Sequence, residues 1–151
     1  MLNKNKVFMA NFILFLWFFI DMIGFSFNGK VLVSKSYKDD YIFFCIFTVC
    51  IILFLNYEKI GKYLLSIWLF MWFSTQFYFH WFFTIFGPHE GKVEYFANTI
   101  KLISINNIYI PDLYHILLHI LILIALILST FYCYYQTKGK NTNANINSQT
   151  S

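Results

Sequence analysis

The chain has 151 residues, of which 59% are hydrophobic and only 12% are charged. An ordinary soluble domain carries about 25% charged residues and leaves much of its surface in water, so this composition excludes a typical water-soluble fold. It predicts an integral membrane protein whose apolar side chains face lipid. The formal net charge is +4, and the basic residues are scattered lysines, a pattern that gives no reason to expect nucleic acid as a partner.

The first apolar run covers residues 8–27 and follows Lys4 and Lys6. It is longer than the apolar part of a signal peptide, and no small-residue cleavage site follows it, so we interpret it as a retained membrane span. The second run covers residues 41–55 and is the shortest. Tyrosines flank it, as they often flank the interfacial ends of a span, so it is also predicted to cross the membrane.

The third apolar run covers residues 63–86 and stops at Gly87-Pro88, a pair that ends helices. The fourth run covers residues 112–135 and closes in tyrosines. The connection between these two runs predicts a short amphipathic helix on the membrane surface. Its apolar residues at helical spacing are Val93, Phe96, Ile100 and Ile103.

Together these runs predict an all-α, multi-pass membrane protein with four transmembrane helices in a bundle. Residues 1–137 would form a single membrane domain, and the polar tail at 138–151 has too little to bury and is predicted to be disordered. An even number of spans places both chain ends on one side of the membrane. A slight excess of lysines on that side favours the cytoplasm for both termini.

The connectivity brings polar residues of three spans to one depth. Asp21 and His80 each lie six residues before the end of their span, and His119 lies seven residues after Asp112, where the fourth span begins. At a rise of about 1.5 Å per residue, each lies roughly 9–10 Å below the membrane face opposite the chain ends. Asp112 itself follows Pro111 at a helix start and is interpreted as a helix cap.

Residue spacing also places the polar residues of each span on one face of its helix. His115 and His119 are four residues apart, and so are Gln76, His80 and Thr84, which gives one polar stripe on each of two spans. Polar groups inside a membrane face the interior of the bundle or a wet cavity, because lipid offers them no partner. We therefore predict a buried polar cluster formed by Asp21, Gln76, His80, His115 and His119.

Three kinds of chemistry suit such a cluster. His80, His119 and Asp21 could ligate a transition metal, and two of the histidines could instead hold a haem iron from both sides. Imidazoles beside a carboxylate could also relay protons near neutral pH. Alternatively the cluster is structural, with Asp21 paired with a histidine and the amide and hydroxyl groups joining helices.

Two functions follow as hypotheses. The first is a small non-enzymatic membrane protein: an accessory, permeation or assembly component, whose partners are the lipid bilayer and another membrane protein or further copies of this chain. The second is a membrane-embedded metal- or haem-dependent redox enzyme that uses the histidines. The sequence has no GxSxG, P-loop, dinucleotide or HEXXH motif. We favour the first hypothesis because four short helices with one modest polar cluster and no soluble catalytic domain are little machinery for an enzyme.

Overall fold

The computed structural model describes residues 2–149, and the side chains of residues 2–138. The chain is mostly helical, which fits the predicted all-α class. The predicted disordered tail, 138–151, lies almost wholly outside the residues whose side chains are described. In chain order the elements are α1 (Lys4–Ile23), β1 (Phe25–Phe27), β2 (Lys30–Val33), α2 (Tyr37–Asn56), α3 (Glu58–Gln76), η1 (Phe77–Phe82), α4 (Phe83–Phe86), α5 (Glu90–Tyr95) and α6 (Leu113–Gln149).

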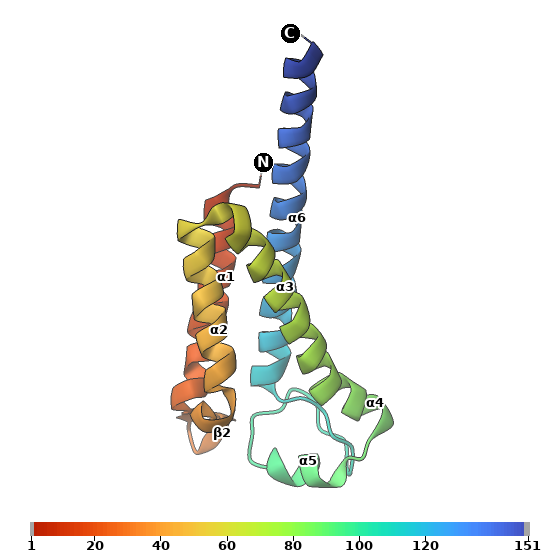
Figure 1. The fold of residues 1–151 in the computed structure, drawn as a ribbon. Helices are drawn as coiled ribbons and strands as arrows, with labels where there is room; N and C mark the ends of the chain where they lie inside the picture. Colours follow the sequence, from red (N-terminus) through yellow and green to blue (C-terminus); the bar gives the residue numbers. More distant parts are fainter. Residues whose placement is uncertain (1, 150–151) are drawn as a thin grey trace.

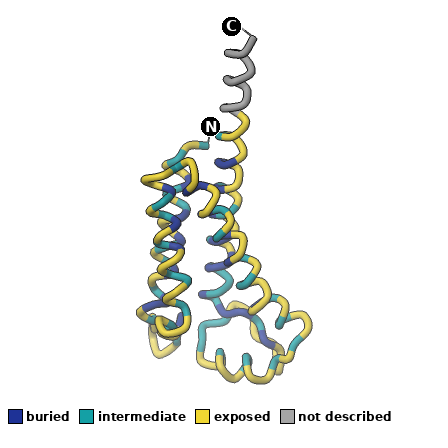
Figure 2. Tube along the Cα trace, viewed as in Figure 1, coloured by how far each residue is buried: buried dark blue, intermediate teal, exposed yellow. Residues whose placement is uncertain are grey.

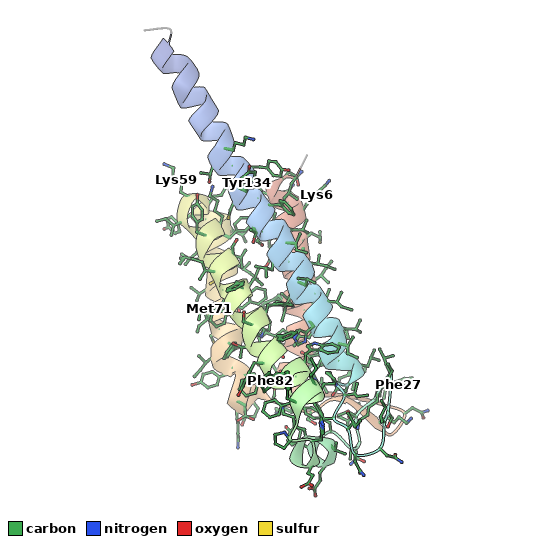
Figure 3. The ribbon with its side chains drawn as sticks, turned by 90° about the vertical axis from the view of Figure 1, so that its right-hand side faces the viewer. Lys6, Phe27, Lys59, Met71, Phe82 and Tyr134 are labelled. Carbon is green, nitrogen blue, oxygen red and sulfur yellow. The ribbon has the colours of Figure 1, made fainter. Side chains whose placement is uncertain are left out.

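The long helices pack side by side in a closed order (Figure 1). Helix α1 contacts α2 and α6, and α3 also contacts α2 and α6, so each has two neighbours. Lys4 lies 3.5 Å from Glu58, and the Tyr132 hydroxyl donates to Glu58 at 2.7 Å, which joins α1, α3 and α6 at what we call the terminal end. The hairpin β1–β2, helix α5 and the long connection to α6 form the opposite end, the loop end. Figure 3 shows Lys59 near the terminal end and Phe82 near the loop end.

The core between the helices is aromatic and tightly packed. Trp72 of α3 is 1% exposed, and its ring lies 4.6 Å from the ring of Phe18 on α1 and 5.3 Å from that of Phe47 on α2. Exposed residues follow the outer faces of the helices (Figure 2), and many of them are large and apolar. Within the described part of the chain, three helices are long and apolar enough to cross a membrane. They are Lys4–Ile23, Tyr37–Asn56 and Leu113–Lys138.

The predicted third span, residues 63–86, is divided among α3, η1 and α4. Helix α3 begins with charged residues, Glu58, Lys59 and Lys62, and it is not among the three described helices that are long and apolar enough to cross a membrane. From Phe77 the backbone changes to the wider π-helix pattern, in which each N–H bonds five residues back instead of four. The helix ends at Phe86, directly before Gly87-Pro88.

The first predicted span, residues 8–27, extends four residues beyond the end of the observed helix. Helix α1 ends at Ile23 because Gly24 takes a φ of 74°, a left-handed value that glycine adopts without strain. Residues 25–27 instead form the first strand of a hairpin, paired antiparallel with β2. The hairpin turns at Asn28 and Gly29, whose φ angles of 50° and 76° are those of a two-residue type I′ turn.

The predicted amphipathic helix is also shorter than expected. Helix α5 covers Glu90–Tyr95, and two backbone hydrogen bonds join the irregular chain beyond it to the hairpin. Val31 N donates to Asn98 O at 3.3 Å, and Ile100 N donates to Val31 O at 3.0 Å. Leu113 N, at the start of α6, donates to Ile100 O at 2.9 Å. These bonds fix the connection across the loop end.

Helices α2 and α3 approach each other unusually closely where the chain reverses. Only Tyr57 separates them, and Gly61 on the first turns of α3 faces the last turn of α2. A Cβ at Gly61 would lie less than 3.0 Å from the backbone of Leu53 and Phe54, a distance that real Cβ atoms essentially never show. The absence of a side chain at this position therefore permits the contact between the two helices.

Candidate functional site

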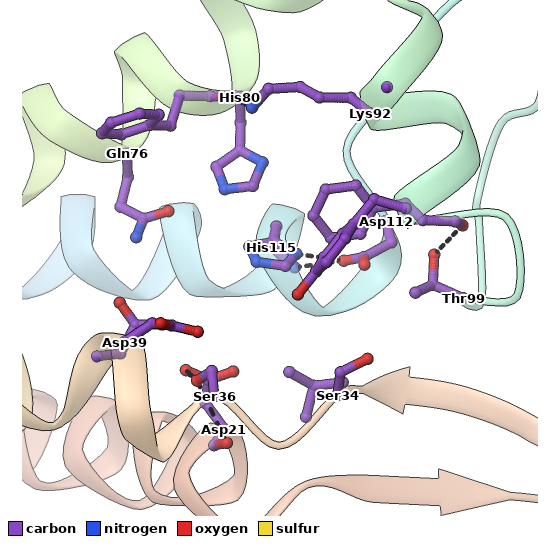
Figure 4. A pocket seen from close by; sticks show the side chains of 16 residues that line it. Asp21, Ser34, Ser36, Asp39, Gln76, His80, Lys92, Thr99, Asp112 and His115 are labelled. Atoms are coloured by element: carbon purple, nitrogen blue, oxygen red, sulfur yellow. Dashed lines mark hydrogen bonds and ion pairs between the residues drawn. The ribbon is translucent and has the colours of Figure 1, made fainter.

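A pocket of about 470 Å³ opens at the loop end (Figure 4). Its lining comes from α1, α2, α3, η1, α5, the start of α6 and the connections between them. Figure 4 shows Asp21 and Ser36 on one side of it, with His80 and Gln76 on the other. The charged lining residues are Asp21, Asp39, Asp40, Lys92 and Asp112. The pocket is therefore rich in carboxylates and lies where three of the long helices end or begin.

Asp21 is bound to a serine rather than to a histidine. Its Oδ2 accepts a hydrogen bond of 2.5 Å from Ser36 Oγ, and its backbone oxygen accepts one of 3.1 Å from Ser36 N. The expected pairing of Asp21 with a histidine is therefore wrong. Asp21 also lies nearer the surface than predicted, two residues before the end of α1, because Gly24 stops the helix early.

Asp112 carries two roles at the start of α6. Its Oδ1 accepts from His115 N at 2.9 Å, which confirms the interpretation of this residue as a helix cap. The same oxygen bonds His115 Nδ1 at 2.7 Å, so the carboxylate also orients the imidazole. Asp112 is only 1% exposed, and its second oxygen, Oδ2, is buried without a hydrogen-bond partner among the described residues.

His80 is held between the connection and α6. Its Nδ1 lies 2.5 Å from the Tyr109 hydroxyl, and its ring centroid lies 4.2 Å from that of His115. Burial, and to a smaller extent the charge of Asp112, raises the pKa of the Tyr109 phenol, which therefore keeps its proton. We infer that Tyr109 donates to Nδ1, and that the proton of the neutral His80 ring lies on Nε2.

The π-helical segment η1 sets which residues of the third run reach the pocket. Gln76 and His80 both line it, whereas Thr84 does not and instead donates to His80 O at 2.9 Å. The predicted stripe at four-residue spacing assumed a regular α-helix, and the wider turn of η1 ends that regularity at Phe77. Gln76 Oε1 is buried there without a hydrogen-bond partner in the described part of the chain.

His119 lies one turn farther along α6 and is not part of the pocket lining. Its ring is 6.0 Å from that of His80, and the rings of Phe73 and Trp81 lie 5.8 and 6.1 Å away. Its Nδ1 donates to His115 O at 3.1 Å. The structure thus brings four of the five predicted cluster residues to one pocket and places the fifth behind it, among aromatic rings.

The predicted metal ligands do not form a ligand set. Among the described residues, no group of three or more His, Cys, Asp or Glu side chains is arranged to hold a metal ion. His80 and His119 approach each other, but Asp21 is engaged by Ser36 on the other side of the pocket. The arrangement therefore gives no support to His80, His119 and Asp21 as metal ligands.

Lys92 is a lining residue that the sequence did not single out. Its ammonium donates to Phe79 O and lies 4.4 Å from the centre of the Phe83 ring and 5.1 Å from that of Tyr109. Burial against these groups lowers the pKa of Lys92. The ion pairs recorded among the described residues do not include it, so the amine does not directly neutralise a pocket carboxylate.

Three more lining residues were not predicted, although the sequence contains a helix-start pattern there: Ser36, Asp39 and Asp40. The pattern Ser36-x-x-Asp39 is typical of a helix start, and α2 begins at Tyr37. The Ser36 side chain does not cap its own helix, since its hydroxyl is used by Asp21. A capping pattern locates these residues at the end of a span, but it does not reveal the contact with α1.

No family model, no curated protein and no solved structure matches this chain. What it can do must therefore be inferred from the pocket. Four carboxylates and two imidazoles face one cavity, and its lysine is directed elsewhere. Such a cavity can accept hydrogen bonds and hold positive charge.

Proposed function

We propose that this protein crosses a bilayer four times and binds a small polar solute in the pocket at its loop end, without transforming it. In this role it is an accessory or permeation component. Both termini lie on the side opposite the pocket, and the lysine distribution favours the cytoplasm for that side. The observation that carries the proposal is Asp112, a carboxylate 1% exposed that lines a cavity of about 470 Å³ with one oxygen lacking a partner.

Four crossings are supported by the path of the chain. If α1, α2 and α6 cross, then the segment from α3 to α4 has to return over the same distance, because it packs between α2 and α6. Residues 58–86 are long enough, since 29 helical residues extend about 43 Å and the apolar layer is about 30 Å thick. Apolar side chains on the outer face of this segment suit contact with lipid: Ile67, Phe70, Met71 and Phe77 are each exposed.

Ligand binding is supported by buried acceptor atoms that lack a hydrogen-bond donor. A buried acceptor without a donor is costly in a fold, and most such groups in proteins have a partner. Asp112 Oδ2 and Gln76 Oε1 both lack one among the described residues, and both belong to residues that line the pocket. A solute with hydrogen-bond donors would satisfy them, and the volume lies within the range of small-molecule sites.

The pocket is less suited to catalysis. The Asp112–His115 pair could orient a general base, but no recorded hydrogen bond of the described residues joins a serine or threonine hydroxyl to an imidazole. Ser36 Oγ donates to Asp21, and Thr99 Oγ donates to Phe96 O at 2.8 Å. The cysteines of the chain, Cys45, Cys50 and Cys133, do not line the cavity. Binding therefore accounts for the geometry better than group transfer does.

Thiol labelling would test the four crossings. In a variant with its native cysteines changed to alanine, Ser34→Cys and Glu94→Cys should react with a membrane-impermeant maleimide from one side of the membrane. Lys59→Cys should react only from the other side. Ser129→Cys, whose parent side chain is 2% exposed, should stay unlabelled until the protein is denatured. Labelling of Glu94→Cys from the same side as Lys59→Cys would show that the segment from α3 to α4 does not cross.

The same variants test the acidic pocket without knowledge of the solute. Ser34 lines the cavity, so Ser34→Cys should react faster with a cationic methanethiosulfonate than with an anionic one of similar size. Lys59→Cys, at the terminal end, serves as the control for intrinsic reagent reactivity. Equal ratios of the two rates at both positions would contradict a solute-accessible pocket of negative potential.

A further inference from the structure

We propose that the solute is a primary ammonium, R–NH₃⁺, with a small organic body. This inference deepens the proposed function and rests on it. The pocket shows a deficit of donors rather than of acceptors. Asp112 Oδ2 and Gln76 Oε1 are buried oxygen atoms that lack a hydrogen-bond donor, and a primary ammonium carries three N–H donors.

The charges around the pocket favour a cation. Asp21, Asp39, Asp40 and Asp112 line it, and Lys92 is the only lysine or arginine among the lining residues. Its ammonium is already taken up by Phe79 O and by the faces of Phe83 and Tyr109. A ligand cation would therefore enter a negative electrostatic potential that Lys92 leaves largely unneutralised.

The arrangement of acceptors separates an organic ammonium from a metal ion. A divalent metal requires several ligands converging on one point, and the described His, Cys, Asp and Glu side chains form no such group. The pocket also has an apolar share, from Val33, Phe79, Tyr95 and Phe96. Apolar and aromatic walls beside carboxylates suit a cation that carries carbon, because ring faces attract ammonium groups.

The position of the pocket allows two sources of the same chemistry. The pocket opens at the loop end, near the level where the polar head groups of a bilayer would lie if the helices cross it. The ammonium could belong to a free amine in the water phase or to the ethanolamine head group of a lipid. Both present R–NH₃⁺ to the same carboxylates, so the experiment has to distinguish them.

The test measures thermal unfolding of the full chain in detergent, followed by the fluorescence of its four tryptophans. The probes are n-butylamine, n-butanol of nearly equal size, tetramethylammonium and calcium chloride. We expect a saturable rise in Tm with butylamine alone, because butanol lacks the charge and tetramethylammonium lacks N–H donors. A second arm adds phosphatidylethanolamine or phosphatidylcholine to the micelles. A rise with phosphatidylethanolamine but not with butylamine identifies the lipid as the source.

Two pocket variants and one control sharpen the result. Asp112→Asn keeps an oxygen for the helix cap but removes the charge, and Gln76→Leu removes the second acceptor. Each should raise the butylamine concentration that gives half of the Tm rise by about tenfold or more, since hydrogen bonds to charged groups are among the stronger ones. Glu94→Gln, on the exposed side of α5, should respond like the unchanged protein.

Two outcomes would overturn the inference. One is a response to calcium or tetramethylammonium that equals the response to butylamine. The other is no response to any amine or to phosphatidylethanolamine. In the second case, a preference of Ser34→Cys for the cationic thiol reagent would show that the acidic pocket exists and that only the ligand class is wrong. Loss of that preference as well would remove the proposed function itself.

Discussion

The close approach of α2 and α3 at Gly61 makes a sharp prediction for the substitution Gly61→Ala. The new methyl group would lie against the backbone of Leu53 and Phe54 at less than 3.0 Å. A flexible side chain could rotate away from such a contact, but a helix backbone cannot. The two helices are joined by a single residue, Tyr57, so they also cannot separate at this end without changing the turn.

The expected magnitude follows from two opposing effects. Forcing extra volume into a packed site costs about 1–3 kcal/mol, and a backbone obstacle places this site at the upper end. Replacing glycine by alanine within a helix returns about 1 kcal/mol through backbone propensity. The net expectation for Gly61→Ala is a loss of about 2 kcal/mol in the free energy of unfolding.

Unfolding in mixed micelles of detergent and increasing SDS, followed by tryptophan fluorescence, measures this difference. Trp72 is a suitable reporter because it is buried between α1 and α2. Gly91→Ala is the matched control, since a Cβ there meets nothing within 4 Å, and it should be neutral or slightly stabilising. If Gly61→Ala unfolds at the same SDS fraction as the unchanged protein, the helices do not approach as described.

Two further predictions concern buried polar pairs. Asn11 Nδ2 donates to Ser129 Oγ at 3.3 Å between α1 and α6, so a double-mutant cycle with Asn11→Ala and Ser129→Ala should give a coupling of about 0.6 kcal/mol. Zero coupling in the same SDS assay would mean that the bond does not form. Asp21→Ala and Ser36→Ala should couple by about 1 kcal/mol or more, whereas Asp21→Ala and His80→Ala should be additive. Coupling of Asp21 to His80 would instead restore the pairing inferred from the sequence.

Part of the pocket could be predicted from the sequence, because the order of the spans determines which helix ends lie at the same face. The counting of residues placed Asp21, His80 and His119 at one depth, and four-residue spacing added Gln76 and His115. His80, Gln76 and His115 line the pocket, whereas His119 lies one turn behind it. Asp21 reached the same pocket for a different reason. Its helix stops four residues earlier than the apolar run, and the serine after the hairpin folds back onto it.

Other features could not be read from hydrophobicity. Phe25 and Phe27 are as apolar as the residues before them, so the strand β1 looks like a continuing span. The dipeptide Asn28-Gly29 was a recognisable hairpin signal that outweighs apolar content, because few other residues accept left-handed angles. The contacts of Lys92 with aromatic rings depend on tertiary packing between distant segments, which no local pattern encodes.

The π-helical segment η1 has a consequence for how this chain can vary. A wider turn accommodates one residue more than a regular turn, so η1 holds an extra residue while the helix on either side keeps nearly the same orientation. Taking one residue out of 77–82 would therefore restore a regular turn with little rotation of α3 against α4. A deletion in the regular part of the same helix, within 63–76, would instead rotate its two halves against each other by about 100°. Single-residue deletions should therefore disturb the packing of this helix least within η1, although the contact of His80 with His115 depends on the wide turn.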